Sequence, residues 1–185
     1  RFLNALGVKS EPDWQRQVHA AVTRSYHANT YLFTTLTNLI GRQFTGTHMT
    51  FGAVHEMTTG QAYRRMSELA GHPILTKILT AIIREESAHT QFYWSMARLE
   101  LRKSNFAKRL ARFVVKNFYY PVGQGSLAAD RTRYTVGLLF NEDESLDSLD
   151  TTVTRRLQQL PGFEGVDTVT RTIGAVAGSK LTASR

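Results

Sequence analysis

The chain has 185 residues, of which 42% are hydrophobic and 21% charged, and its formal net charge is +8. This composition is typical of a soluble globular protein with one domain, or one domain and a short appendage, and no apolar run approaches the roughly 18 residues of a membrane span. The chain has no cysteine, which excludes disulfide frameworks, zinc-thiolate sites and cysteine nucleophiles.

Helices are predicted throughout the first forty residues. The opening segment 1–6 is interpreted as the end of a helix whose beginning is missing, since no Met precedes it. A second helix is expected over 14–23, after capping residues, and a third over 26–40, where many Thr and Asn residues leave its limits uncertain. Residues 41–46, with a glycine at each end, are predicted to be a connection.

Two long helices, 47–70 and 74–101, are expected to form a hairpin that turns at Gly71, His72 and Pro73. On the second helix Glu86 and His89 are three residues apart, so their side chains project from one face. Glu56 lies about 16 residues before the turn and the Glu86/His89 midpoint about 16 after it, which at roughly 1.5 Å per residue places them at one level. Carboxylates and imidazole are transition-metal ligands, so the three residues predict a metal site.

Each member of this group also has a simpler interpretation. Glu86 and His89 alone are compatible with a solvated surface pair, and Glu56 and Thr59 with an exposed helix face. The common level of the three ligands favours the metal site, and a hydroxyl on Thr59, one turn from Glu56, is expected to point into the region that the carboxylate occupies. Their apolar neighbours Ile82, Ile83, Phe92 and Tyr93 favour burial. Glu85 is not expected to bind the metal but to lie behind the ligands or to face solvent. His55 is expected to be an exposed or hydrogen-bonded histidine.

The rest of the chain is also predicted to be helical. A basic amphipathic helix is expected to follow a break at 104–105 and to end before Pro121, and its apolar side consists of Phe106, Leu110, Phe113, Val114 and Phe118. Further helices are expected over 126–140 and 148–160, separated by an acidic segment, and the last ten residues are interpreted as a loose tail. No strand pattern is present, so we predict an all-α fold, with a helical bundle over 1–140 and an acidic segment, short helix and tail over 141–185.

Charge is distributed unevenly along the chain. The segment from Arg98 to Lys116 holds seven Lys or Arg residues and one Glu, whereas 141–150 holds five acids and no base. A basic helical face can contact nucleic acid, an anionic lipid surface or an acidic carrier protein. Its aromatic residues fall on the apolar side and are not interleaved with the bases, which argues against binding to single-stranded nucleic acid.

The motifs around the predicted metal site resemble the second half of the soluble acyl-[acyl carrier protein] desaturases. The resemblance is carried by the run from Val54 to Thr59, by the Gly-His-Pro turn and by the run from Ile83 to His89, and it is best over about 45–125. It implies a ferritin-like helical bundle with a di-iron centre, in which Glu56, Glu86 and His89 are iron ligands and Thr59 supplies a hydroxyl on the oxygen side. The family's other ligands, a Glu and a Glu-x-x-His, would precede residue 1, so a partial bundle is expected.

The resemblance further implies an O₂-dependent oxidoreductase that acts on acyl chains carried by acyl carrier protein. The carrier would dock on the basic face from Arg98 to Lys116, a ferredoxin-like protein would supply electrons, and the protein would be a cytoplasmic homodimer. Two other hypotheses remain open. One is a degenerate ferritin-like subunit with a structural or regulatory role, and the other is a basic helical protein that binds nucleic acid.

Overall fold

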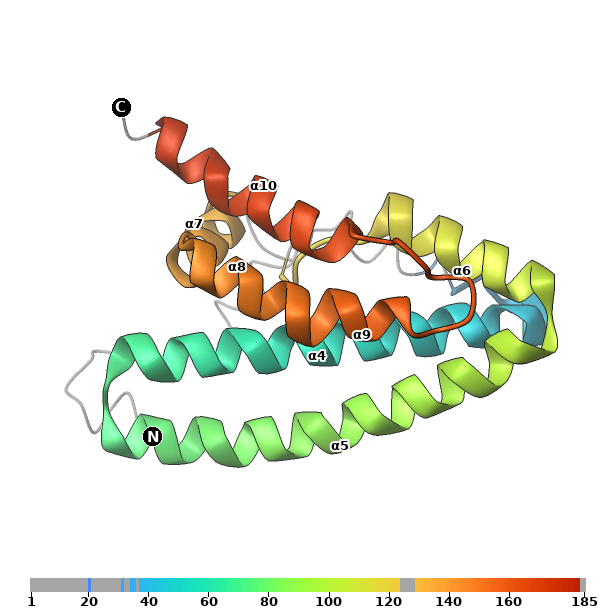
Figure 1. The fold of residues 1–185 in the computed structure, drawn as a ribbon, viewed down its shortest axis with the longest axis horizontal. Coiled ribbons are helices and arrows are strands. Elements are labelled where there is room, and N and C mark those ends of the chain that lie inside the picture. Colours follow the sequence, from blue (N-terminus) through green and yellow to red (C-terminus); the bar gives the residue numbers. More distant parts are fainter. Residues whose placement is uncertain (1–19, 21–30, 32–33, 36, 124–128, 184–185) are drawn as a thin grey trace.

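The computed structural model describes residues 20, 31, 34–35, 37–123 and 129–183, and side chains as far as residue 178. All regular elements in this part of the chain are helices, and it contains no strand, which confirms the all-α prediction (Figure 1). The helices expected at 1–6, 14–23 and 26–40 lie largely outside the described residues. The expected connection at 41–46 contains a short 3₁₀ helix, η1 (Gly41–Phe44), which leads directly into the next helix.

The helical hairpin is present as predicted. It consists of α4 (Thr45–Ala70) and α5 (Pro73–Lys103), which lie side by side along most of their length (Figure 1). Gly71 ends α4 with a φ of 56°, a left-handed conformation that glycine adopts without the penalty of a Cβ atom. His72 caps α5 by accepting a hydrogen bond from the backbone N–H of Leu75, and Pro73 occupies the first turn, where its missing N–H is not needed.

The basic helix is α6 (Asn105–Phe118), which begins where the Ser104 hydroxyl accepts a hydrogen bond from the Ala107 N–H at 3.2 Å. Its predicted apolar side was largely wrong. The structure buries Ala107, Ala111, Val114 and Val115 and leaves Phe106, Phe113 and Phe118 more than half exposed. Small side chains let α6 approach α4 closely, so packing selects a face that hydrophobicity alone does not identify.

The C-terminal third is more helical than predicted. After α7 (Ala129–Leu139), a nearly continuous helix is formed by α8 (Asp143–Leu149), a π-helical turn η2 (Asp150–Thr154) and α9 (Arg155–Gln158). It begins inside the acidic segment, where carboxylates in the first turn interact favourably with the helix N-terminus. The predicted loose tail was wrong, because α10 (Thr168–Ala183) covers residues 176–183.

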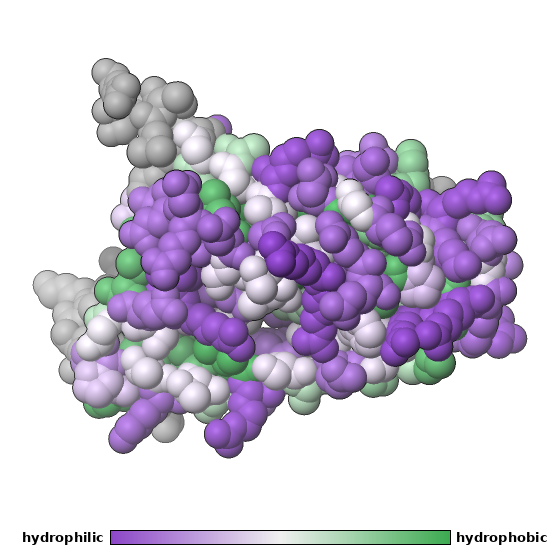
Figure 2. All heavy atoms as spheres, in the orientation of Figure 1, coloured by the Kyte–Doolittle hydropathy of each residue, from purple (hydrophilic) through white to green (hydrophobic). Residues whose placement is uncertain are grey.

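A single hydrophobic core connects the hairpin with the C-terminal helices. It includes Val54 from α4, Val115 from α6, Leu149 from α8 and Ile173 from α10, each with 1% or less of its surface exposed. The core therefore includes residues from both sides of the expected boundary at 140/141. The face shown in Figure 2 is covered mostly by hydrophilic side chains, with apolar side chains visible in scattered positions.

Within the described part of the chain, every helix is too short or too polar to cross a lipid bilayer.

Candidate metal centre

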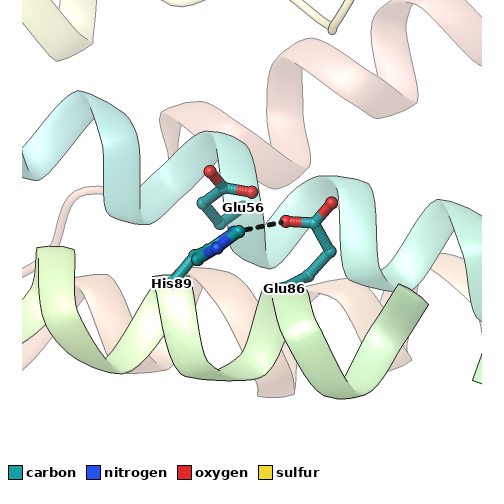
Figure 3. Close-up of side chains that lie close together, drawn as sticks. All are labelled: Glu56, Glu86 and His89. Carbon is teal, nitrogen blue, oxygen red and sulfur yellow. Dashed lines mark hydrogen bonds and ion pairs between the residues drawn. The ribbon is translucent and has the colours of Figure 1, made fainter. Parts of the chain in front are cut away.

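The hairpin brings the three predicted ligands together. Glu56 projects from the middle of α4, and Glu86 and His89 project from α5 toward it (Figure 3). One carboxylate or imidazole ligand atom from each residue lies within 4.8 Å of the others. The rotation of α4 that permits this is set by its opposite side, where Val54 is completely buried in the core.

The group is more open at His89 than at Glu86, although both residues belong to α5. The His89 Nδ1 lies 3.3 Å from Glu86 Oε2, and the His89 side chain is 59% exposed, whereas that of Glu86 is 19% exposed. The imidazole therefore lies at the edge of the site, and both carboxyl groups lie deeper between the helices. A cation held here would have ligands on one side and remain accessible from the other.

Glu56 is electrostatically unsatisfied. Burial raises its pKa from 4.5 to about 7, a hydrogen bond with Glu86 and the charge of Glu86 act in the same direction, and only His89 opposes them. Two carboxyl groups that share one site cannot both ionise without a compensating positive charge. Below about pH 7, Glu56 therefore holds a proton at the position where a divalent cation would supply that charge.

The donor set fits one transition-metal ion. Two carboxylates and one imidazole suit iron, and they match the contribution that two of the four helices make to a di-iron carboxylate centre. The described residues provide no second group of three or more such side chains.

Next to the group lies a cavity of about 570 Å³, bounded by α4, α5, η2 and α9. Its wall includes Glu56 and Glu86, and the remaining residues were not identified from the sequence. Arg64 could have been found there, because it lies two helical turns beyond Glu56 on the same face. Trp94 stands in the same relation to Glu86, but Arg156 could not have been found, because nothing in the sequence indicates that α9 lies beside α5. The indole N–H of Trp94 donates to the Arg156 carbonyl oxygen at 3.3 Å and joins the two helices.

Thr59 lines a different cavity from the one beside Glu56. This second cavity is about 180 Å³, and its wall also includes Tyr63 and Phe140. That Thr59 places a hydroxyl beside the Glu56 carboxylate stays a prediction. The residue four positions after Glu56, Gly60, occupies the corresponding wall of the cavity beside the ligands.

The two neighbouring titratable residues differ in their surroundings. Glu85 is exposed and lies outside the three-residue group. His55 is partly buried, packs against Phe51 and Tyr119, and has a pKa lowered by burial. Its Nε2 is buried without a hydrogen-bond partner among the described residues, so it is neither the exposed nor the satisfied histidine that was expected.

Comparison with known proteins gives no match: no family model, no curated protein and no solved structure is similar to this chain.

Proposed function

We propose that Glu56, Glu86 and His89 bind iron and form half of a carboxylate-bridged di-iron centre in a ferritin-like bundle. The observation that carries this proposal is the convergence of three metal-ligating side chains from two adjacent helices, with ligand atoms within 4.8 Å. The raised pKa of Glu56 supports it, because a carboxyl pair held in one place without a cation is unfavourable and a cation removes the repulsion.

The activity we propose is O₂-dependent oxidation of an acyl chain carried by acyl carrier protein, of the acyl-[acyl carrier protein] desaturase type. Iron, when bound, would supply the O₂ chemistry. In this chain Glu56 and Glu86 would hold the metal with negatively charged oxygen atoms, and His89 would hold it with a neutral nitrogen. The helices that carry the three ligands would fix the positions of these atoms before metal binds, which limits reorganisation in the reaction.

A complete two-iron centre needs further ligands. We propose that a Glu and a Glu-x-x-His from two additional helices, as the resemblance implies, complete it. A second candidate function is a ferritin-like subunit that binds one metal ion, or none, and acts as a structural or regulatory partner. The exposure of His89 on the edge of a group with only three ligands is the observation that favours this alternative.

Metal stoichiometry tests the site directly. After anaerobic loading with Fe(II) and removal of excess metal, we expect iron in the wild-type chain and a loss of at least about tenfold in affinity for Glu86→Ala and His89→Ala. Glu85→Ala is the matched control. It removes the adjacent carboxylate on the same helix, which is exposed and does not belong to the three-residue group. Equal iron content in the Glu85 and Glu86 variants would refute the site. One iron per chain would favour the half-site, and two irons in a protein that also contains the additional helices would favour the enzyme.

We propose that acyl carrier protein docks on the basic face from Arg98 to Lys116, with a ferredoxin-like electron donor and a homodimer as further features of the same function. Several bases of this face already have partners, including Lys103 with Glu100 and Arg112 with two backbone carbonyls. Arg109 and Lys116 are exposed, so reversing the charge at these two positions tests the docking proposal. The double variant Arg109→Glu, Lys116→Glu should weaken binding of an acidic carrier without changing iron content. Unchanged carrier affinity would contradict the docking proposal.

A further inference from the structure

Two arginines line the cavity that contains Glu56 and Glu86. One is Arg64 on α4 and the other is Arg156 on α9. Arg156 is held in place by uncharged partners: its Nη2 donates to Gln91 Oε1 at 2.9 Å, and its guanidinium carbon lies 5.7 Å from the centroid of the Trp94 ring. This arrangement fixes the guanidinium and leaves its charge without a counter-ion.

Like most described arginines of this basic chain, the two cavity arginines have no carboxylate partner, although an arginine next to each of them does. Arg65 pairs with Glu68 and Glu142, and Arg155 pairs with Asp150. In the described part of the chain, by contrast, no carboxylate lies within ion-pair distance of Arg64 or Arg156. Each cavity arginine is thus adjacent in sequence to an arginine that does have an acidic partner.

The cavity arginines do not neutralise the metal group either. Among the described residues, neither arginine lies within ion-pair distance of Glu56 or Glu86. The two positive charges and the carboxyl pair therefore act as separate features of one cavity of about 570 Å³. A ligand can contact both without displacing an internal ion pair.

The remaining wall is suited to a polar group attached to an apolar body. Gln61, Thr90 and Thr152 offer amide and hydroxyl groups, and Met57, Ile83 and Trp94 offer apolar surface. Thr152 belongs to the π-helical turn η2, an irregularity that occurs frequently at functional sites. Guanidinium groups bind carboxylates and phosphates with paired, charge-assisted hydrogen bonds, and arginine is the residue most often used for this recognition.

We infer that this cavity binds a small molecule with an anionic oxygen group, a carboxylate or a phosphate, which Arg64 and Arg156 hold while the rest of the molecule extends toward Glu56 and Glu86. The inference deepens the proposed function, because it assigns an anionic substrate class to the cavity beside the metal group. The anion could belong to a free acyl chain, as its carboxylate, or to the phosphopantetheine arm of a carrier protein, as its phosphate.

Calorimetric titration of the metal-free chain with two matched pairs of probes tests the inference. One pair is octanoate and octanamide, and the other is phosphopantetheine and pantetheine. At least one anionic probe should bind about tenfold more tightly than its neutral analogue. A preference for octanoate identifies the free acyl source and a preference for phosphopantetheine identifies the carrier arm. No preference in either pair would overturn the inference.

Three variants assign the preference to residues. In Arg64→Gln and in Arg156→Gln, the anionic and neutral probes should bind with nearly equal affinity. Arg155→Gln removes an equal charge from the helix of Arg156, outside the cavity, and should retain the preference for the anionic probe. Because Arg64 is exposed, its replacement tests the inference even if the Arg156 variant folds poorly. Equal preference in all three variants and the wild type would overturn the assignment.

Metal binding separates this inference from the proposed function. Arg64→Gln and Arg156→Gln should take up Fe(II) like the wild type, whereas His89→Ala, which alters the metal group at a residue outside the cavity wall, should lose metal and keep the preference for the anionic probe. A wild-type chain that binds no Fe(II) would therefore refute the metal centre alone. A wild-type chain that shows no preference for the anionic probes would refute the anion site alone.

Discussion

Gly52 of α4 lies directly against the phenol ring of Tyr93 of α5, so closely that a Cβ atom at position 52 would come within 2.6 Å of the ring. Gly52 is one helical turn before Glu56, and Tyr93 is one turn after His89. The contact therefore lies beside the metal group and sets the separation of the two helices there. A glycine in a helix interior usually costs stability, so its presence here is explained by the ring that it accommodates.

Gly52→Ala should destabilise the protein by about 1–3 kcal/mol, because the added methyl group overlaps the ring and forces α4 and α5 apart. The same displacement should weaken metal binding, since it separates Glu56 from the α5 ligands. Urea unfolding and Fe(II) titration measure the two effects. Gly60→Ala is the control in the same helix, because nothing lies within 4 Å of the added atom. It should be neutral or stabilising by up to about 1 kcal/mol, and equal destabilisation by both variants would contradict the role of the ring.

The hairpin and its ligand group were predictable from sequence because they depend on local rules. Gly71 and Pro73 mark the turn, and a constant rise per residue then determines which positions of the two helices lie at the same level. The three-residue spacing of Glu86 and His89 determines that they share a face. No knowledge of distant segments is needed for Glu56 to meet them.

The features that sequence reasoning missed depend on contacts between distant segments. In α6 the large residues Phe106 and Phe113 dominate any hydrophobic pattern, but the structure buries the side with Ala107 and Ala111, which permits closer packing. Arg156 reaches the cavity only because α9 packs across the hairpin. The final helix has the Gly, Ser and Thr content of a loose tail, and tertiary packing overrides that composition.

The stability of the metal-free protein should decrease as the pH rises from 4.5 to about 7, owing to Glu56. Its folded-state pKa, about 7, is higher than the unfolded value of 4.5, so in this range the folded chain holds a proton that the unfolded chain has released. The stabilisation is complete below pH 4.5 and is lost as the pH rises through 7. Urea unfolding in the presence of a chelator, at pH 5 and pH 7.5, measures it.

Glu56→Gln serves as the reference for this pH dependence, because it keeps the shape of the protonated side chain and removes its titration. The free energy of unfolding of the Gln variant, minus that of the wild type, should increase as the pH rises from 5 to 7.5. A difference that does not change with pH would show that Glu56 titrates normally. A difference that changes in the opposite direction would show that the folded state favours its charged form.

Substitutions on opposite sides of α6 should have unequal costs. Val115 is fully buried, and Val115→Ala should cost about 2 kcal/mol through lost contacts and the space left behind. Phe113 is 57% exposed, and Phe113→Ala should cost no more than about 0.5 kcal/mol although it removes many more atoms. Urea unfolding of the two variants compares them within one helix. A larger cost for Phe113 would restore the apolar side predicted from sequence.

Arg112 should contribute to stability and Arg109, three residues earlier in the same helix, should not. The Arg112 Nη1 donates hydrogen bonds to the carbonyl oxygens of Gly162 at 2.7 Å and Glu164 at 3.1 Å, and so joins α6 to the loop before α10. Arg112→Ala should cost about 1–3 kcal/mol, because these bonds have a charged donor and their carbonyl acceptors lose a partner. Arg109→Ala removes the same charge and has the same effect on helix propensity, and it should change the free energy of unfolding by less than about 0.5 kcal/mol. Urea unfolding compares the stabilities of the two variants. A carrier-binding defect in the Arg112 variant would then be attributed to the loosened loop before α10. The same defect in the Arg109 variant would indicate that this face docks the carrier.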